Sequence, residues 1–252
     1  MSRPPALVLL PALLVLLAVV LGILAWHHVI PGGWFLRDLI EDPDLREERL
    51  RLQHREERLL AFQEEAVSSL AERVVFLGSS TIEHFPLERF FAAGRTLNRG
   101  IGEERAEELL MRLGQTLPPR PAGFVLYVGA VDVHGDRRPP EFVARRLAAV
   151  LRYLRATSPE APCLVLGILP PRAPTREELS RLHAVNLALA LTARRSGATF
   201  LHTGKPPITD ARGGLSPSLS RDRHHLNEAG YAALARLILD ADSPLAALLQ
   251  PR

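Results

Sequence analysis

The chain contains very little cysteine and has no strong excess of either charge. Its 252 residues include one cysteine, Cys163, which excludes an intrachain disulfide framework and a cysteine-rich zinc site. The setting of Cys163 in Pro-Cys-Leu-Val-Leu predicts a small buried residue of a strand. The formal net charge is only +3, and arginine and glutamate interleave without a long basic run. The composition therefore argues against nucleic-acid binding.

Charge is also absent from one long segment near the N-terminus. Residues 6–26 carry no charged side chain, and 19 of these 21 residues are hydrophobic, the exceptions being Pro11 and Gly22. A helix of about 21 residues covers the roughly 30 Å of a bilayer core. The segment predicts a transmembrane helix that acts as an uncleaved signal anchor, because no small-x-small cleavage site closes it. A cleaved signal peptide and a buried globular helix are the alternatives.

The charge distribution after this segment suggests three parts. The expected organisation is a signal anchor over residues 1–30, a charged helical spacer over 31–72 and a soluble domain over 73–252. One apolar helical face in the spacer predicts that its C-terminal half packs on the domain; it comprises Leu59, Phe62, Ala66 and Leu70. With a short flank before the anchor, we expect a single-pass membrane protein whose domain lies on the extracytoplasmic side.

Short β-rich runs alternate with helical segments after residue 73. The strands are expected near residues 74–77, 96–98, 124–128, 164–168 and 198–201. Helices are expected near residues 104–115, 140–157, 175–196 and 228–239. Such alternation predicts a parallel α/β sheet with helices on both faces. Ligands of these sheets bind beyond the carboxyl ends of the strands, so the residues after each run are the candidates for chemistry.

A serine follows the first predicted strand in a turn that begins with glycine. The run 78–82 reads Gly-Ser-Ser-Thr-Ile, which places Ser80 where a nucleophile is needed. A loop or N-cap serine is the plain alternative. Ile82 stands where the Gly-x-Ser-x-Gly elbow has its second glycine, so the α/β-hydrolase version of the triad is disfavoured.

A second group of polar residues precedes the last predicted helix. Asp222 lies three residues before His225, a spacing that lets the carboxylate fix the imidazole tautomer. We expect the ring of His224 to point elsewhere and Asn227 to cap the helix. Solvated loop residues are again the alternative.

Together these segments resemble the SGNH (GDSL-like) hydrolases, and within them the platelet-activating-factor-acetylhydrolase-like esterases. The matching blocks are residues 74–82 (Val-Val-Phe-Leu-Gly-Ser-Ser-Thr-Ile), 97–102 (Leu-Asn-Arg-Gly-Ile-Gly), 128–132 (Val-Gly-Ala-Val-Asp) and 222–231 (Asp-Arg-His-His-Leu-Asn-Glu-Ala-Gly-Tyr). The resemblance implies a three-layer α/β/α flavodoxin-like fold with about five parallel strands. It also implies that Ser80 is the nucleophile, His225 the base and Asp222 its orienting acid.

The sequence departs from the family at the oxyanion hole. The resemblance implies three donors: the backbone N–H of Ser80, the backbone N–H of a glycine that is Glu103 here, and an asparagine that is Val131 here. Val131 has no side-chain donor, and losing one oxyanion donor typically costs about 10²–10³ in kcat. A glycine-like backbone would be strained at Glu103, and its carboxylate would repel an oxyanion unless it points to solvent.

Other residues near these blocks have either a compensating or a structural role. His84, His134 and Arg99 could supply a donor, or they could be surface or structural residues. The stiff loop over residues 170–174 is expected to form a wall of the cleft. Asn186 could reach into the domain or lie exposed on its helix.

The sequence thus favours a membrane-anchored serine esterase that hydrolyses small acyl esters of lipid or envelope carbohydrate. A weakened or inactive binding or scaffold protein is the alternative that Glu103 and Val131 suggest. Acyl transfer to a sugar hydroxyl by the same residues is a third reading. The resemblance implies no metal and no organic cofactor. The expected partners are an ester substrate and a membrane, and the sequence does not specify the oligomeric state.

Overall fold

The structure, a computed structural model, describes residues 6–26, 41–65 and 72–250. These residues form two compact units, Met1–Gln53 and His54–Arg252. The predicted spacer is described only in part, because residues 31–40 and 66–71 lie outside the described residues, and Ala66 and Leu70 fall among them. Helix α3 (Pro43–Glu64) begins in the first unit and ends in the second.

The apolar N-terminal segment is helical. Helix α1 (Ala6–Trp26) is 21 residues long and contains Pro11. Among the helices in the described part of the chain, none combines the length and the apolar character that a membrane crossing requires. The predicted transmembrane helix is therefore not supported by the structure.

The second unit is built on one parallel sheet of five strands. The strands are β1 (Val74–Gly78), β2 (Thr96–Gly100), β3 (Gly123–Tyr127), β4 (Cys163–Leu166) and β5 (Thr199–Leu201). They pair in the order β2-β1-β3-β4-β5, and every pair is parallel. The predicted α/β class and the five-stranded parallel sheet are confirmed. Cys163 is the first residue of β4, as its setting predicted, but it is only partly buried, which corrects the prediction of a buried residue.

Four long helices connect or follow the strands: α5 (Ala106–Thr116), α7 (Pro140–Thr157), α8 (Arg176–Arg195) and α9 (Glu228–Leu239). Shorter elements are α4 (Ser80–Glu83), η2 (Leu87–Arg89), α6 (Ala130–His134), η3 (Pro217–Leu219) and α10 (Pro244–Leu249). The amide oxygen of Asn227 accepts the N–H of Gly230 at 2.9 Å, so the predicted cap of α9 is present.

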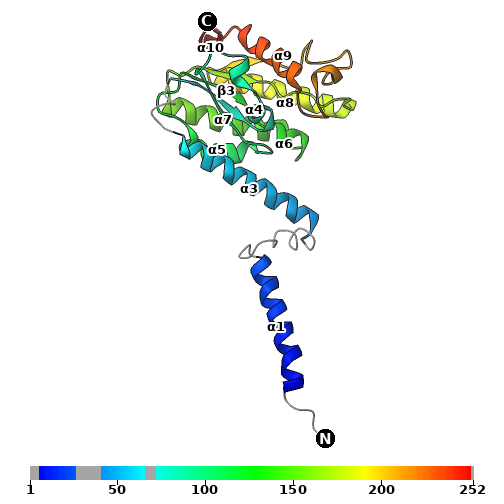
Figure 1. Cartoon of the computed structure of the whole chain (residues 1–252). Coiled ribbons are helices and arrows are strands. Elements are labelled where there is room, and N and C mark those ends of the chain that lie inside the picture. Colours follow the sequence, from blue (N-terminus) through cyan, green and yellow to red (C-terminus); the bar gives the residue numbers. More distant parts are fainter. Residues whose placement is uncertain (1–5, 27–40, 66–71, 251–252) are drawn as a thin grey trace. The chain divides into compact units, whose positions relative to one another are not determined.

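The helices cover the sheet on both sides (Figure 1). Helix α7 packs against both α5 and α8, as expected for right-handed crossovers that lead in turn from β2 to β5. Helices α9 and α10 pack together, and α10 also contacts β1. Strands β1 and β3 are buried along their whole length, because they lie in the middle of the sheet between the helical layers.

The C-terminal end of α3 covers two buried arginines beside the sheet. The ring of Phe62 is 6% exposed, and the guanidinium groups of Arg99 and Arg112 lie 4.5 Å and 5.8 Å from its centroid. Arg112 also forms an ion pair with Glu104, in which both side chains are 1% exposed. This end of α3 is therefore part of the fold of the second unit.

Candidate active site

The turn after β1 presents Ser80 at the carboxyl edge of the sheet. Gly78 ends the strand, Ser79 precedes the helix, and Ser80 is the first residue of α4. A Cβ atom at residue 78 would collide with the carbonyl oxygen of Tyr127 on the neighbouring strand, so only glycine fits this turn. The hydroxyl of Ser80 is thereby held where parallel α/β sheets bind their ligands.

The structure brings Ser80 and His225 together across 145 residues of sequence. The Ser80 Oγ lies 3.0 Å from His225 Nε2. On the other side of the ring, His225 Nδ1 lies 2.8 Å and 2.9 Å from the two carboxylate oxygens of Asp222. Because a carboxylate can only accept, Nδ1 carries the proton and Nε2 is left to accept the Ser80 hydroxyl proton. The three groups form one continuous hydrogen-bonded chain.

The loop before α9 holds Asp222 in its ionised form. Its Oδ1 atom accepts the backbone N–H of His224 at 2.8 Å and that of His225 at 2.9 Å. Burial raises the pKa of Asp222, but these two N–H groups and the His225 side chain outweigh it and hold the pKa well below its ordinary value. Asp222 is therefore a carboxylate at neutral pH, and it can stabilise a positively charged His225.

His84 and Arg221 flank this chain of groups, and their pairing was not predicted from the sequence. The rings of His84 and His225 lie 5.9 Å apart, edge to face. Arg221 Nη2 lies 3.3 Å from His84 Nδ1. Because a guanidinium can only donate, His84 accepts at Nδ1 and carries its proton at Nε2. Partial burial and then the charge of Arg221 lower the pKa of His84, which keeps this ring neutral.

Two of the three predicted oxyanion positions retain a backbone N–H group that can donate. Ser80 lies at the start of α4, and Glu103 has the left-handed backbone that the sequence predicted to be strained there, with φ of 57°. The Glu103 side chain is exposed, so water screens the repulsion between its carboxylate and an oxyanion. Val131 lies on α6, where an asparagine would have added a side-chain donor, and its isopropyl group has none.

The remaining candidates from the sequence have structural partners. Arg99 is 1% exposed and donates to the carbonyl oxygen of Thr116 at 3.0 Å. The amide of Asn186 is buried and bridges the backbone N–H and carbonyl of Ile168, which corrects the reading of an exposed position. Neither side chain is therefore available as an oxyanion donor.

His134 is also tied to the backbone. Its Nε2 lies 3.0 Å from the carbonyl oxygen of Leu169 and donates to it. Burial lowers the pKa of His134 to about 4, although the bond to Leu169 opposes this shift. The ring of His224 lies 5.1 Å from that of His134, whereas it is His225 that bonds to Ser80.

The proline-rich loop after β4 is joined to the loop that carries Asp222 and His225. The backbone N–H of Arg172 donates to the carbonyl oxygen of Arg223 at 2.7 Å. In return, Arg223 Nη1 donates to the carbonyl oxygen of Arg172 at 3.2 Å, while its Nη2 pairs with Glu178 at 2.6 Å. The loop 170–174 therefore braces the histidine loop.

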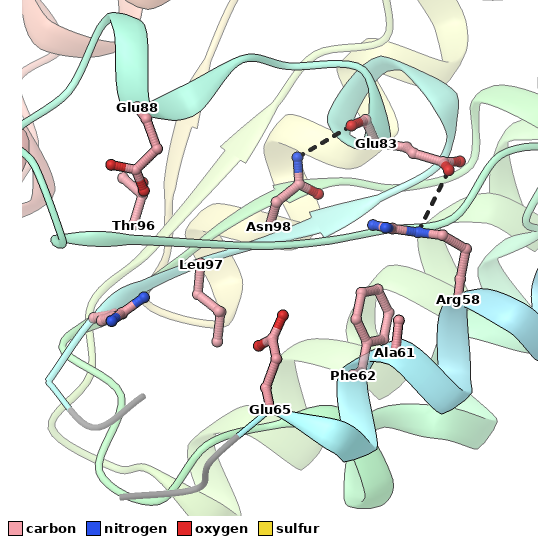
Figure 2. A pocket seen from close by; sticks show the side chains of 10 residues that line it. Arg58, Ala61, Phe62, Glu65, Glu83, Glu88, Thr96, Leu97 and Asn98 are labelled. Carbon is pink, nitrogen blue, oxygen red and sulfur yellow. Dashed lines mark hydrogen bonds and ion pairs between the residues drawn. The ribbon is translucent and has the colours of Figure 1, made fainter. Parts of the chain in front are cut away.

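A cavity of about 510 Å³ lies behind the serine turn, between the end of α3 and the edge strand β2 (Figure 2). Its polar lining includes Arg58, Glu65, Glu83, Glu88 and Asn98. Ser80, Asp222 and His225 do not line it, so this cavity is not the predicted reaction site. No group of three or more histidine, cysteine or acidic residues in the described ranges is arranged to hold a metal ion.

A parallel sheet thus holds a serine, a histidine and an aspartate at its carboxyl edge, joined by hydrogen bonds in the order that serine hydrolases use. A comparison with protein families matches residues 83–233 to the GDSL-like lipase/acylhydrolase family. The chain belongs to this family, and it is an enzyme of the ester-hydrolase class. The predicted family is thus confirmed. The matched segment contains Glu103, Asp222 and His225 and begins three residues after Ser80.

Solved structures share the fold at low sequence identity. A protein from Streptococcus pneumonia, provisionally described as a platelet activating factor, has a TM-score of 0.71 and 23% identity over 78% of this chain and 96% of its own. A GDSL-like lipase from Bacteroides thetaiotaomicron has a TM-score of 0.55 and 19% identity over 75% and 94%. An acetyl-xylooligosaccharide esterase from Geobacillus has a TM-score of 0.55 and 14% identity over 67% and 92%. The comparison with curated proteins gives no match.

Proposed function

We propose that the protein is a serine esterase that removes small acyl groups through Ser80, His225 and Asp222. The observation that supports this most strongly is the continuous hydrogen-bonded chain, with 3.0 Å between Ser80 Oγ and His225 Nε2 and 2.8 Å between His225 Nδ1 and Asp222. Both distances lie within the range for a nucleophile, its base and the group that orients the base.

The proposed reaction begins when His225 takes the hydroxyl proton of Ser80. Ser80 Oγ then bonds to the ester carbonyl carbon, and the backbone N–H groups of Ser80 and Glu103 stabilise the oxyanion. His225 gives the proton to the leaving alcohol oxygen, which produces an acyl-enzyme. Water, deprotonated by His225, then attacks the acyl carbon. The bond from this carbon to Ser80 Oγ breaks, His225 returns the proton to Oγ, and the carboxylic acid is released.

The absence of a donor at Val131 favours a second candidate, a catalytically weakened binding or scaffold protein. The loss of one oxyanion donor corresponds to about 3–4 kcal/mol of transition-state stabilisation, which slows an esterase without removing its nucleophile or base. Acyl transfer to a sugar hydroxyl uses the same three residues, and it differs only in which hydroxyl attacks the acyl-enzyme.

The test is the hydrolysis of p-nitrophenyl acetate by the purified chain, compared with the variants Ser80→Ala and His225→Ala. We expect measurable turnover by the parent and a loss of at least about 10³-fold in both variants, because each removes a member of one catalytic unit. Equal rates in parent and variants would rule out the esterase mechanism. Addition of a sugar as acceptor would show acyl transfer if acetylated sugar replaces acetate.

Attachment to a membrane remains a prediction from the sequence, supported by the 19 hydrophobic residues in the segment 6–26. The structure adds no support to this prediction, because none of the described helices is long and apolar enough to cross a membrane. Carbonate extraction of membranes from cells that express the whole chain tests this prediction. Protease treatment of intact cells then tests the expected extracytoplasmic position of the domain. Release into the carbonate supernatant would exclude a membrane-spanning anchor.

A further inference from the structure

One carboxylate connects the serine turn to the loop of the predicted oxyanion hole. Glu83 is the last residue of α4, the helix that begins with Ser80. Its carboxylate is 12% exposed and accepts the backbone N–H of Gly102. Gly102 directly precedes Glu103, whose backbone N–H is the proposed second oxyanion donor. A short helix thus carries the nucleophile at one end and the anchor of the oxyanion loop at the other.

Two side chains of α3, His54 and Arg58, also contact the Glu83 carboxylate. His54 Nε2 lies 2.9 Å from Glu83 Oε1 and 3.1 Å from Oε2. Arg58 Nε lies 3.4 Å from Glu83 Oε1, and Arg58 Nη2 donates to the carbonyl oxygen of Gly100 at 3.1 Å. Arg58 therefore contacts both Glu83 and the loop that Glu83 binds.

The backbones of α4 and the loop are also closely packed. The Asn98 amide donates to the carbonyl oxygens of Ile82 at 2.7 Å and Glu83 at 3.2 Å, and its own oxygen accepts the N–H of Gly100 at 2.9 Å. Figure 2 shows Asn98 reaching the backbone carbonyl of Glu83 and Arg58 reaching its carboxylate. A Cβ atom at residue 100 would collide with the Glu83 backbone, so glycine is required for this approach.

The loop needs such fixing because its next residue is in an unfavourable conformation. The left-handed region is unfavourable for any residue other than glycine, and Glu103 has φ of 57°. A hydrogen bond from a backbone N–H to a buried carboxylate is charge-assisted and about twice as strong as a neutral one. The bond from Gly102 to Glu83 can therefore hold Glu103, the proposed second donor, in this conformation.

We propose that Glu83 is a positioning residue for the oxyanion hole and that His54 and Arg58 hold its carboxylate in place. The inference rests on the proposed esterase function. The proposal gives helix α3 an indirect role in catalysis, because its side chains His54 and Arg58 act on the reaction through Glu83. It also predicts that loss of the hydrogen-bond acceptor at residue 83 lowers the rate of the chemical step and not the binding of the ester.

The experiment compares the full chain with the variants Glu83→Ala and Glu83→Gln and with a control, Glu88→Ala. Glu88 lines the same cavity but bonds to Thr96 and Gly94, outside the oxyanion loop. A fluorophosphonate titration of Ser80 gives the concentration of competent sites, so that kcat refers only to folded enzyme. Turnover of p-nitrophenyl acetate then gives kcat and KM for each protein.

We expect Glu83→Ala to lower kcat per titrated site by about 10–100-fold with KM within about threefold of the parent, because small misplacements of catalytic groups have effects of this size. Glu83→Gln should recover most of the rate, since its amide oxygen can accept the Gly102 N–H. Glu88→Ala should match the parent. If Glu83→Ala does not fold, the double variant His54→Ala/Arg58→Ala should lower kcat by about 3–10-fold at constant KM.

The results separate the two proposals. A kcat of Glu83→Ala within twofold of an active parent would overturn the positioning role and leave the esterase function standing. Three other results would also overturn the positioning role. They are a change in Glu83→Ala that is confined to KM, a Glu83→Gln variant as slow as Glu83→Ala, and an unchanged kcat in the double variant. A parent that neither hydrolyses the ester nor reacts with the fluorophosphonate would overturn the esterase function, and the positioning role with it.

Discussion

At the scale of single residues, the rate of the proposed reaction depends on the small number of hydrogen-bond donors that can stabilise the oxyanion. The N–H groups of Ser80 and Glu103 remain, while the third donor position is Val131. Val131 is only half-buried at the start of α6, so a polar side chain of similar size can be accommodated there. This position therefore offers the clearest way to change the rate without altering Ser80, Asp222 or His225.

We predict that Val131→Asn raises kcat on p-nitrophenyl acetate by about tenfold or more, because it restores an amide donor to the hole. Steady-state kinetics at saturating ester measures the effect, with Val131→Leu as a control that adds no donor. A rate for Val131→Asn equal to that of Val131→Leu would show that the hole is built without a donor at this position.

A second residue-scale prediction concerns the stability of the protein at low pH. The pKa of His134 is lowered to about 4 in the folded protein, against about 6.5 for a histidine in an unfolded chain. Between these values the unfolded chain binds a proton that the folded protein does not, so stability falls as the pH decreases from 6.5 to 4. Replacement by glutamine keeps an amide donor for Leu169 and removes the titration.

We therefore predict that the free energy of unfolding of the parent falls by about 2–3 kcal/mol more than that of His134→Gln between pH 7 and pH 4. Urea unfolding at several pH values measures both curves. His84 and His224 also have lowered pKa values, but they are present in both proteins and cancel in the comparison. Parallel curves would contradict the assignment of this pH dependence to His134.

The sequence was informative about those residues whose chemistry is local. Asp222 and His225 are three residues apart, so their contact follows from spacing and loop geometry. The pairing of His84 with Arg221 spans 137 residues, and that of His54 with Glu83 spans 29. Neither pairing has a periodic or motif signal, because each depends on how separate elements pack.

At the scale of elements, the strands and long helices could be predicted because their patterns are regular. Helix α7 (Pro140–Thr157) and helix α9 (Glu228–Leu239) match their expected bounds, and the five strands differ by one or two residues at their ends. Short elements such as α4 and η2 were not predicted, since three or four residues give no measurable period.

Helix α3 shows what a periodic pattern alone leaves out. Its apolar face predicted packing on the domain, but the cover that Phe62 gives to Arg99 and Arg112 depends on buried arginines that a sequence pattern assigns to the surface. Glu65, which directly follows α3, places its Oε2 2.6 Å from Arg99 Nη2. Removing the C-terminal part of α3 together with Glu65 would leave a buried guanidinium without its anion and its aromatic cover.

We predict that a chain lacking residues 1–53 keeps the stability of the second unit, whereas one lacking residues 1–65 loses about 3 kcal/mol. The estimate combines the burial of Phe62 with its contacts to the two arginines. Urea unfolding of the two truncated proteins measures the difference. Equal midpoints with equal slopes would show that the end of α3 does not contribute to the stability of the sheet domain.

At the scale of the whole molecule, the parallel sheet explains why residues from distant blocks meet. Ser80 follows β1, Glu103 follows β2 and Val131 follows β3, and these are the three neighbouring strands β2-β1-β3. The carboxyl ends of parallel strands share one edge, so three consecutive loops converge there. The order of the blocks in the sequence thus predicted both the fold and the neighbourhood of the site, while the side-chain contacts around it required the structure.

The proposal that Ser80 is the nucleophile is tested most directly by finding which residue a fluorophosphonate modifies. After reaction between pH 6 and 9 and cleavage at arginine, Ser80 lies in the peptide 74–89, which fragmentation by mass spectrometry can resolve residue by residue. We predict one phosphonyl group, which is attached to Ser80 and not to Ser79, and none in the variant Ser80→Ala. The absence of an adduct over this pH range, or its presence on another residue, would contradict the proposal that Ser80 is the nucleophile.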